Sequence, residues 1–325
     1  MPDLYAGIDL GGTSIHGALS DGDGNVLTRD VTPTNSHVGP LAVLDRVESL
    51  LRALCATVHE GPASLRGIGI GLPGLVDQQN GIAKFMPNLP TQWRDVPVAE
   101  YLCDRLCCPV AIMNDVRMAT LGELKYGRGR DQPTATLAFF SIGTGIGGGL
   151  ALDGKLHLGP LGAAGELGHQ TLQPNGARCG CGNRGCLETL ASGPAIAASG
   201  IRLMTSGLAP TLHEAAAGDA SRVTPALMAA AAEHDELIRE ALEDAFTWIG
   251  IAAANVVSVV HAQQVILGGG VSEIGDPLVT KVKQVIDDRI GMFPTDDVRV
   301  SQSALGDRAG VMGAIALAVT NASKH

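Results

Sequence analysis

The chain has 325 residues, which is enough for two domains with separate hydrophobic cores. Hydrophobic residues make up 45% of it, charged residues 17% and aromatic residues 3%, as in a globular protein. The formal net charge of −10 at pH 7 argues against nucleic acid or an anionic membrane as the main partner. The first five residues lack the basic segment of a signal peptide, so we expect a soluble protein of the cytoplasm.

Helix and strand signals alternate along the chain. We expect a strand over residues 5–9, a helix over 41–58, a buried strand over 67–71, a helix over 98–106 and a strand over 110–113. Later, the Ala-rich stretches 215–217 and 226–232 predict helices. The apolar stretch 245–260 is interrupted by Thr247, Asn255 and Ser258, so it predicts a buried helix rather than a membrane span.

The start of each half of the chain repeats without gaps at an offset of 132 residues. The repeat aligns Gly11, Gly17, Asp21 and Gly22 with Gly143, Gly149, Asp153 and Gly154. Each copy has the pattern of a β-hairpin with a Gly-rich turn, followed by an Asp-Gly turn. The sequence therefore predicts two α/β lobes around a shared cleft. We expect a small lobe over 1–117 and a large lobe over 118–311, with a helix over about 312–325 returning to the small lobe.

Both hairpins have turns suited to binding phosphate. In the first, Gly11, Gly12 and Thr13 follow Asp9, and in the second, Thr144 and Gly145 follow Ser141. Since only the first copy has a carboxylate, we expect Asp9 to act near Mg²⁺ through water and Thr144 with its neighbours to bind phosphate oxygens.

A third glycine run, at Gly268 and Gly269, follows a buried strand and would let an adenosine lie against the backbone. Each of the three runs alone is compatible with a purely structural turn. Together and in this order they favour a nucleotide site. None is a Walker P-loop, because no Gly-Lys-Ser/Thr follows.

Asn114 and Asp115 end a predicted strand, where two interpretations are open. The pair can cap the following helix, or Asp115 can take the proton from a sugar hydroxyl that attacks a phosphoryl group. The nucleotide motifs favour the second interpretation. Asn88 lies in a loop with two prolines and has an amide for hydroxyl recognition, although such a loop can also serve as a simple connection.

Four metal ligands lie close together in the sequence. Cys179, Cys181 and Cys186 form a Cys-x-Cys-x4-Cys pattern, with His169 ten residues upstream, which suits a structural tetrahedral Zn²⁺. Such an ion would bring the nearby Glu166 and Glu188 together, as a polyhydroxyl ligand requires. A surface zinc knuckle or unliganded thiols are the alternatives.

These motifs resemble those of the ROK family (repressor, open reading frame, kinase) over nearly the whole chain. The family pattern Asp-x-Gly-Gly-Thr matches residues 9–13, Asn-Asp matches 114–115, and Gly-x-x-Gly-Glu-x-Gly-His matches 162–169. The resemblance implies a two-lobed actin-like ATPase (ribonuclease H-like) fold, with dimers usual. The segments 71–77 and 87–90 are most similar to the glucokinase branch.

The resemblance also implies roles for single residues. Asp115 would be the catalytic base, and the zinc ligands would be His169, Cys179, Cys181 and Cys186. The sugar ligands would be Asn88, Asn114, Glu166, His169 and Glu188. This chain departs from the family at Ser14 and His16, and at Arg117 and Met118, where small residues are commoner. These departures put fine specificity in doubt.

The expected activity is phosphorylation of the 6-hydroxyl of glucose with ATP and Mg²⁺. Kinases for N-acetylmannosamine, N-acetylglucosamine or fructose are alternatives within the family. A sugar-responsive repressor would need a DNA-binding domain before Asp9, for which ten residues leave no room. A sugar-binding regulator without turnover is a further alternative. The presence of both Asp9 and Asp115 argues against it.

Overall fold

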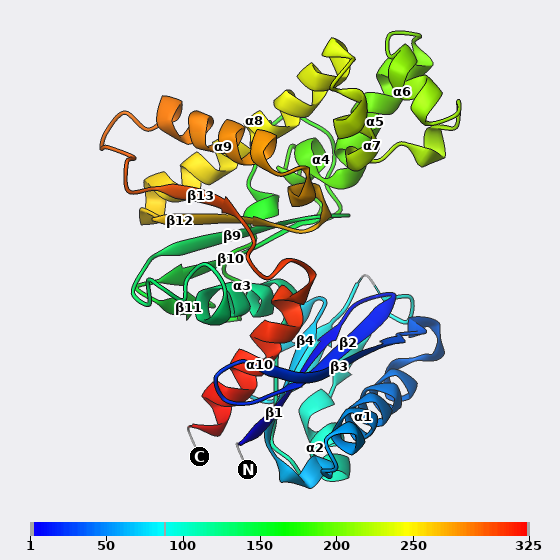
Figure 1. Ribbon diagram of the computed structural model, residues 1–325, viewed down its shortest axis with the longest axis vertical. Helices are drawn as coiled ribbons and strands as arrows, with labels where there is room; N and C mark the ends of the chain where they lie inside the picture. The colour runs from blue at the N-terminus through cyan, green and yellow to red at the C-terminus, as the bar shows by residue number, and fades with distance from the viewer. Residues whose placement is uncertain (1–2, 88, 324–325) are drawn as a thin grey trace. The chain divides into compact units, whose positions relative to one another are not determined.

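The computed structural model describes residues 3–87 and 89–323 (Figure 1). Asn88, an expected sugar ligand, lies outside the described residues. The chain divides into two compact units. The first contains Met1–Pro133, Lys155–Ala164 and Ala304–His325, and the second contains Thr134–Gly154 and Gly165–Ser303.

A five-stranded sheet of order β3-β2-β1-β4-β8 forms the centre of the first unit. Its strands are β1 Leu4–Leu10, β2 Ser14–Ser20, β3 Val26–Pro33, β4 Leu65–Leu72 and β8 Val110–Asn114. Strands β1, β4 and β8 are parallel, and β2 and β3 are antiparallel to them. The first unit also has a small antiparallel sheet of β5 Leu75–Asp77, β6 Ile82–Phe85 and β7 Arg94–Val96.

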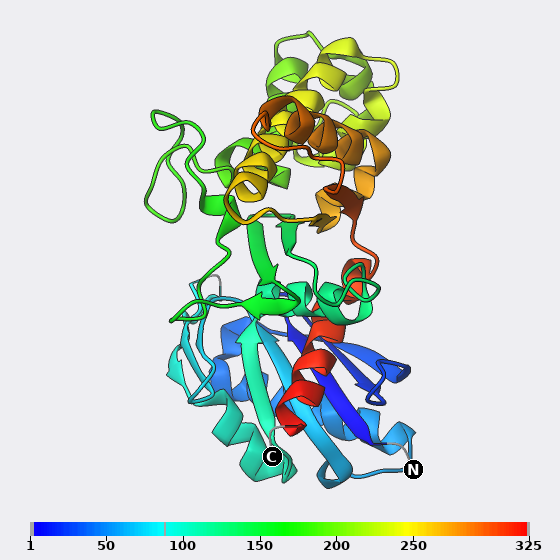
Figure 2. The same cartoon turned by 90° about the vertical axis from the view of Figure 1, so that its left-hand side faces the viewer.

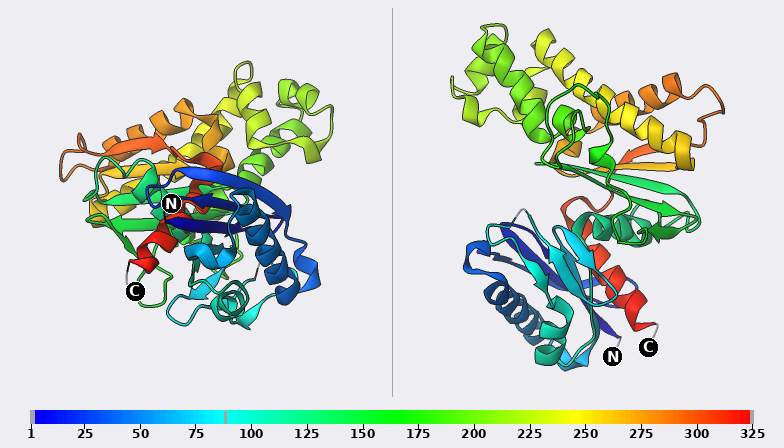
Figure 3. Two further views of the ribbon diagram at one scale, coloured as in Figure 1. Left: turned by 60° about the horizontal axis from the view of Figure 1, so that its bottom comes forward. Right: turned by 180° about the vertical axis from the view of Figure 1, so that it is seen from behind.

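Two groups of helices pack against the first sheet (Figures 1 and 3). Helix α1 Pro40–Thr57 contacts β2 and β3, and α2 Val98–Leu106 contacts β8. Helix α10 Ala309–Ala322 packs on β1 and β4 and also crosses α3 Asp115–Tyr126. The bounds of α1, α2, β4 and β8 agree with the predicted elements to within two residues, because their apolar periodicity is strong.

The α10 helix approaches the first sheet closely because the facing strand positions are glycines. A Cβ atom added at Gly69 would lie 1.9 Å from the carbonyl oxygen of Ala314, and one at Gly7 would lie 2.5 Å from that of Val311. These distances are too short for any side chain. The glycines therefore allow the helix backbone to rest directly on the strands.

A second five-stranded sheet has the same pattern, of order β11-β10-β9-β12-β13, and all of its strands except β11 belong to the second unit. Its strands are β9 Leu137–Ile142, β10 Ile146–Leu152, β11 Lys155–His157, β12 Gln264–Gly268 and β13 Arg299–Gln302. Strand β10 coincides with β2 at the offset of 132 residues that the sequence repeat predicts. The hairpin registers differ by one residue, since Leu10 pairs with Ile15 whereas Ile142 pairs with Ile146.

Helices account for most of the second unit between β11 and β13. They are α4 Glu188–Ala191, α5 Gly193–Thr205, α6 Pro210–Ala215, α7 Pro225–Ala231, α8 Glu236–Val260 and α9 Asp276–Arg289. Helix α8 is long and apolar enough to cross a membrane by length and composition alone, but half of its most apolar window is buried in the unit. It packs along α9, in agreement with the predicted buried helix. Helix α6 ends at Ala215, the first residue of the Ala-rich stretch 215–217, and Ala217 has a φ of 52°.

The division into units differs from the predicted lobes at three places, because residues 118–133, 155–164 and 304–311 belong to the first unit. The expected boundary after residue 117 lies inside α3, whereas the first unit continues to Pro133. The reason is the contact of α3 with α10: a Cβ atom at Gly122 would lie 2.5 Å from the carbonyl oxygen of Ala309. The crossing of two helix backbones at small residues holds all of α3 in the first unit.

Candidate functional site

Two carboxylates of the first unit flank one glycine. Asp9 lies near the end of β1, Asp115 is the first residue of α3, and Gly71 on β4 pairs with Asp9. A Cβ atom at Gly71 would lie 3.5 Å from Oδ1 of Asp9 and 3.7 Å from Cα of Asp115. These are van der Waals distances, so both acidic residues lie directly beside this glycine. The start of α10 is also close, since a Cβ atom at Gly310 would lie 2.2 Å from Oδ2 of Asp9.

The environment of this pair favours its protonated form. Burial raises the pKa of Asp9 to about 6. Burial, and next the negative charge of Asp9, raise the pKa of Asp115 to about 7. A carboxylate with a pKa near neutrality can both take and release a proton at physiological pH, as a general base must.

Asn114 performs the capping role that the sequence left open. Its Oδ1 accepts hydrogen bonds from the backbone N–H groups of Val116 and Arg117, at 3.1 and 3.2 Å, and so caps α3. Its Nδ2 donates to the carbonyl oxygen of Gly74 at 3.1 Å. Capping by Asn114 and a chemical role for Asp115 are therefore compatible, because different side chains carry them.

The two glycine turns expected to bind phosphate differ in size. In the first, Gly11 N donates to Ser14 O at 2.9 Å, and Gly12 and Thr13 are exposed. In the second, Gly143 N donates to Gly145 O at 2.8 Å, and Thr144 is exposed at the tip. Each turn thus presents a hydroxyl and unhindered backbone to a ligand.

Ser14 and His16, two departures from the family pattern, follow the first turn. The hydroxyl of Ser14 is 2.9 Å from Nε2 of His16. Because directly paired residues share a face of the sheet, His16 lies on the same face as its partner Asp9.

The third glycine run lies beside the second turn. Gly269 has a φ of 78°, and a Cβ atom there would lie 2.5 Å from the carbonyl oxygen of Ile142. A Cβ atom at Gly270 would meet nothing within 4 Å. Gly269 is thus required by the fold itself, whereas Gly270 leaves open space. The structure therefore brings together two of the predicted nucleotide motifs, those at residues 143–145 and 268–270, in the second unit.

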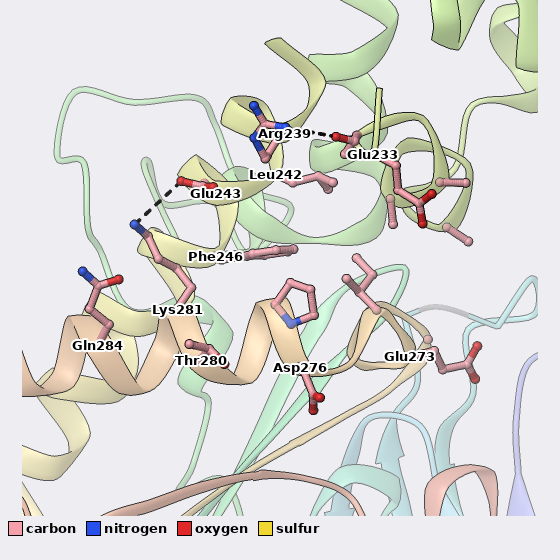
Figure 4. Close-up of a pocket in the computed structure, with 17 residues that line it drawn as sticks. Glu233, Arg239, Leu242, Glu243, Phe246, Glu273, Asp276, Thr280, Lys281 and Gln284 are labelled. Carbon is pink, nitrogen blue, oxygen red and sulfur yellow. Dashed lines mark hydrogen bonds and ion pairs between the residues drawn. The ribbon is translucent and has the colours of Figure 1, made fainter. Parts of the chain in front are cut away.

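A cavity of about 930 Å³ begins at Gly270. Its walls come from α7, α8, α9 and the 3₁₀ turn Gly270–Ile274, as Figure 4 shows. Leu242 and Phe246 on α8 provide apolar surface, and Thr280 and Gln284 on α9 provide polar groups. The volume and the mixed lining are those of a small-molecule site, for which about 300–1,000 Å³ is usual. The Ala-rich stretch 226–232, which forms one wall, carried no functional prediction.

The four expected zinc ligands are brought together in the second unit. The ligand atoms of His169, Cys179, Cys181 and Cys186 all lie within 4.8 Å of one another. They are carried by the turn Leu167–His169 and by a loop that projects from the unit (Figure 2). Short β-bridges pair Thr171 with Cys186 and Arg178 with Arg184, and hold the loop together.

The separations inside this cluster suit a tetrahedral ion. Sγ of Cys181 and Cys186 are 3.7 Å apart, and Sγ of Cys179 is 3.6 Å from Nδ1 of His169. Ligands about 2.0–2.3 Å from one zinc ion would be separated by about 3.5–3.8 Å at tetrahedral angles. Burial raises the pKa of Cys186 to about 12, so a buried thiolate here needs a cation beside it. The residues fit Zn²⁺.

Both acidic residues near the cluster contact it. Oε2 of Glu166 is 3.9 Å from Nε2 of His169, whose other ring nitrogen faces the thiols. Oε1 of Glu188 is 3.6 Å from Sγ of Cys179, and its Oε2 accepts a hydrogen bond of 2.9 Å from Ile146 N. Glu188 thus links the cluster to the strand that follows the second glycine turn, a connection that the sequence did not reveal.

The paired sheets of equal strand order, each opening with a glycine hairpin, define the class of protein: this is the two-lobed actin-like ATPase fold. Within that class the chain belongs to the ROK family, whose family model matches residues 5–321.

Similar proteins include enzymes and regulators. A glucokinase from Thermotoga maritima is 34% identical over 325 residues, which cover 98% of each chain. A xylose repressor from Caldicellulosiruptor bescii is 31% identical over 323 residues, which are 97% of this chain and 78% of that protein. Among solved structures, a ROK family glucokinase from Streptomyces griseus in complex with glucose and AMPPNP has a TM-score of 0.82 at 28% identity, covering 98% of this chain and 99% of that one.

Proposed function

We propose that this protein is an ATP- and Mg²⁺-dependent hexose kinase that phosphorylates the 6-hydroxyl of glucose. The observation that carries the proposal is the pair of carboxylates around Gly71, with Asp115 poised near neutral pKa. The similarity to glucokinases over nearly the full length of both chains supports the substrate class.

Asp115 takes the proton of the attacking hydroxyl as that oxygen bonds to the γ-phosphorus of ATP, and the bond from phosphorus to the β,γ-bridging oxygen breaks. The products are the sugar phosphate and ADP. Bound Mg²⁺ would neutralise charge on the phosphates, and Asp9 would hold it through water. Most of the rate enhancement then comes from alignment, for which the exposed Thr13 and Thr144 supply hydroxyl contacts to phosphate oxygens.

The nucleotide base occupies the cavity that begins at Gly270. A planar base fits against Phe246 and Leu242, and the polar edge of the base faces Thr280 and Gln284. The open space at Gly270 lets the ribose approach the backbone.

The sugar is held by Asn114, Glu166, His169 and Glu188, with Asn88 as a further expected ligand. Zinc bound by His169, Cys179, Cys181 and Cys186 has no open coordination position, so its role is structural. Zinc would hold the His169 ring in place, and Nε2 of that ring lies 3.9 Å from Oε2 of Glu166. We further propose that the protein acts in the cytoplasm as a homodimer.

A sugar-responsive regulator is the second candidate, because xylose repressors are about as similar to this chain as some glucokinases are. A regulator needs sugar binding without turnover. Kinases for fructose, N-acetylglucosamine or N-acetylmannosamine would keep the mechanism and change only the sugar.

The test is a set of initial phosphorylation rates with ATP and Mg²⁺ on glucose, mannose, fructose, N-acetylglucosamine and N-acetylmannosamine, for wild type and Asp115→Ala. We expect the highest kcat/KM on glucose and loss of about 10³-fold or more in the variant. A preference for another sugar would move the substrate assignment. Sugar binding without turnover on any of the five would overturn the kinase proposal and favour the regulator.

A further inference from the structure

Arg117 is a buried cation beside the candidate base. It is the third residue of α3, and its side chain is 2% exposed, although arginine is almost never fully buried without partners.

The guanidinium group of Arg117 joins two segments of the first unit. Its Nε donates to the carbonyl oxygen of Ala164 and its Nη2 to that of Ala163, both at 3.0 Å. Its Nη1 donates to Oδ1 of Asn114 at 3.2 Å. The planar fork of arginine can satisfy these three acceptors at once, which a lysine ammonium on its flexible stem cannot do in the same geometry.

The contact with Asn114 limits what that amide can offer to a sugar. Oδ1 of Asn114 accepts from Val116 N, Arg117 N and Arg117 Nη1, and a carbonyl oxygen has two lone pairs. Nδ2 already donates one hydrogen to the carbonyl oxygen of Gly74. The orientation of the amide is fixed, because the two backbone N–H groups and the guanidinium group of Arg117 can only donate. What remains for a ligand is one N–H of Nδ2.

The contacts with Ala163 and Ala164 hold the end of the segment 155–164. Glu166 follows two residues after Ala164, and Gly165 between them has a φ of 92°. In the sequence this is the point at which the chain passes from the first unit to the second. Arg117 thus fixes the backbone that leads into the zinc-binding segment.

We propose that Arg117 is a positioning residue that orients Asn114 as a hydrogen-bond donor toward the sugar and anchors the backbone before Glu166. This inference rests on the proposed function. The sugar hydroxyl that accepts from Asn114 can then donate its own hydrogen to Asp115, so the sugar is bound with one polarity. The positive charge of Arg117 also lowers the pKa of Asp115, against the effects of burial and Asp9.

The test compares Arg117→Lys, Arg117→Met and the exposed control Arg130→Met. Sugar affinity is measured by calorimetry, and kcat/KM is measured against pH, at a temperature at which circular dichroism shows every variant folded. We expect Arg117→Lys to lose about tenfold or more in kcat/KM for the sugar with unchanged nucleotide affinity, because small misplacements are costly. Arg117→Met should in addition shift the acidic limb of the pH profile to higher pH, and Arg130→Met should match wild type.

A double-mutant cycle with Asn114→Ala separates positioning from general stability. If Arg117 acts through Asn114, Arg117→Lys should have less than a threefold further effect on sugar affinity in the Asn114→Ala protein. Wild-type sugar affinity in folded Arg117→Lys, or a full and additive effect in the double variant, would overturn the inference. Absence of sugar phosphorylation by the wild type would instead count against the proposed function.

Discussion

The two five-stranded sheets have equivalent strand orders, but the residues at aligned positions of β1 and β9, and of their partner strands β4 and β12, differ in size. In the first sheet Gly7 and Asp9 on β1 pair with Gly69 and Gly71 on β4. In the second sheet Phe139 and Ser141 on β9 pair with Ile266 and Gly268 on β12. The glycine pair of the first sheet admits the backbone of α10, whereas Phe139 and Ile266 fill the same positions of the second with their own buried side chains.

This difference explains how one repeated plan serves two purposes. The glycines of the first sheet bring the start of α10 and the start of α3 next to Asp9, so two carboxylates gather there. In the second sheet a Cβ atom at Gly268 would lie 2.6 Å from the Phe139 ring, and the strand end carries a hydroxyl instead of an acid. The first hairpin thus suits chemistry, and the second suits nucleotide binding.

Among the differences between the two hairpins, the largest effect is expected from the carboxylate of Asp9, which aligns with the hydroxyl of Ser141. Asp9→Asn should lower kcat by about 100-fold or more, because it removes the acid expected near Mg²⁺. The aligned change Ser141→Ala should lower kcat by less than threefold. Steady-state kinetics at saturating sugar and varied Mg²⁺ measures both. Equal losses in the two variants would contradict the division of roles.

The next largest effect concerns the zinc cluster, which has no counterpart in the first unit among the described residues. Removal of zinc by chelation, or Cys181→Ser, should weaken sugar binding by about 10- to 100-fold and lower the melting temperature. Calorimetry on protein whose zinc content is verified by elemental analysis provides the measurement. Unchanged sugar affinity in zinc-free protein would contradict the inference that the cluster positions Glu166 and Glu188 for the sugar.

A smaller effect tests the glycine face of the first sheet. Gly69→Ala should lower the free energy of unfolding by about 3 kcal/mol, because its Cβ atom would lie 1.9 Å from the carbonyl oxygen of Ala314. Gly61→Ala is the control, since nothing lies within 4 Å of a Cβ atom there. Urea denaturation measures both. A cost for Gly69→Ala no greater than that of the control would show that α10 does not depend on this glycine.

A further effect is a pH dependence of stability. Between the usual pKa of 3.8 and the folded value of about 7, the folded protein keeps a proton on Asp115 that the unfolded chain releases. Asp115 therefore lowers stability progressively as pH rises through this range, and Asp115→Asn should remove the loss. We expect the variant to gain on the order of 4 kcal/mol relative to wild type between pH 4 and 8, since one pKa unit corresponds to about 1.4 kcal/mol. Equal pH dependence of the two melting temperatures would contradict the raised pKa of Asp115.

Much of the fold could be predicted from the sequence because its signals are local. Apolar periodicity located α1, α2, β4 and β8, and the ungapped repeat placed β10 at the position of β2. The spacing of the candidate metal ligands also predicted that they lie together, since three cysteines on one short loop have few ways to lie apart. The hairpin registers differ by one residue, which the ungapped alignment concealed.

The contacts that the sequence did not reveal are all long-range. The buried side chain of Arg117 donates to the carbonyl groups of Ala164 and Ala163, which are 47 and 46 positions away in the sequence. The bond from Ile146 N to Glu188 joins residues 42 positions apart. No local pattern marks such partners, because they are chosen by how distant elements pack.

The role of Asp115 is tested most directly by the sugar affinity of Asp115→Asn, measured by calorimetry beside its single-turnover rate of phosphorylation. In the proposed function Asp115 takes the proton, and Asn114, Glu166, His169 and Glu188 supply most of the sugar contacts. We therefore expect a dissociation constant within about threefold of wild type and a rate lower by about 10³-fold or more. A variant that phosphorylates sugar at the wild-type rate, or that loses affinity as much as rate, would contradict the assignment of Asp115 as the base.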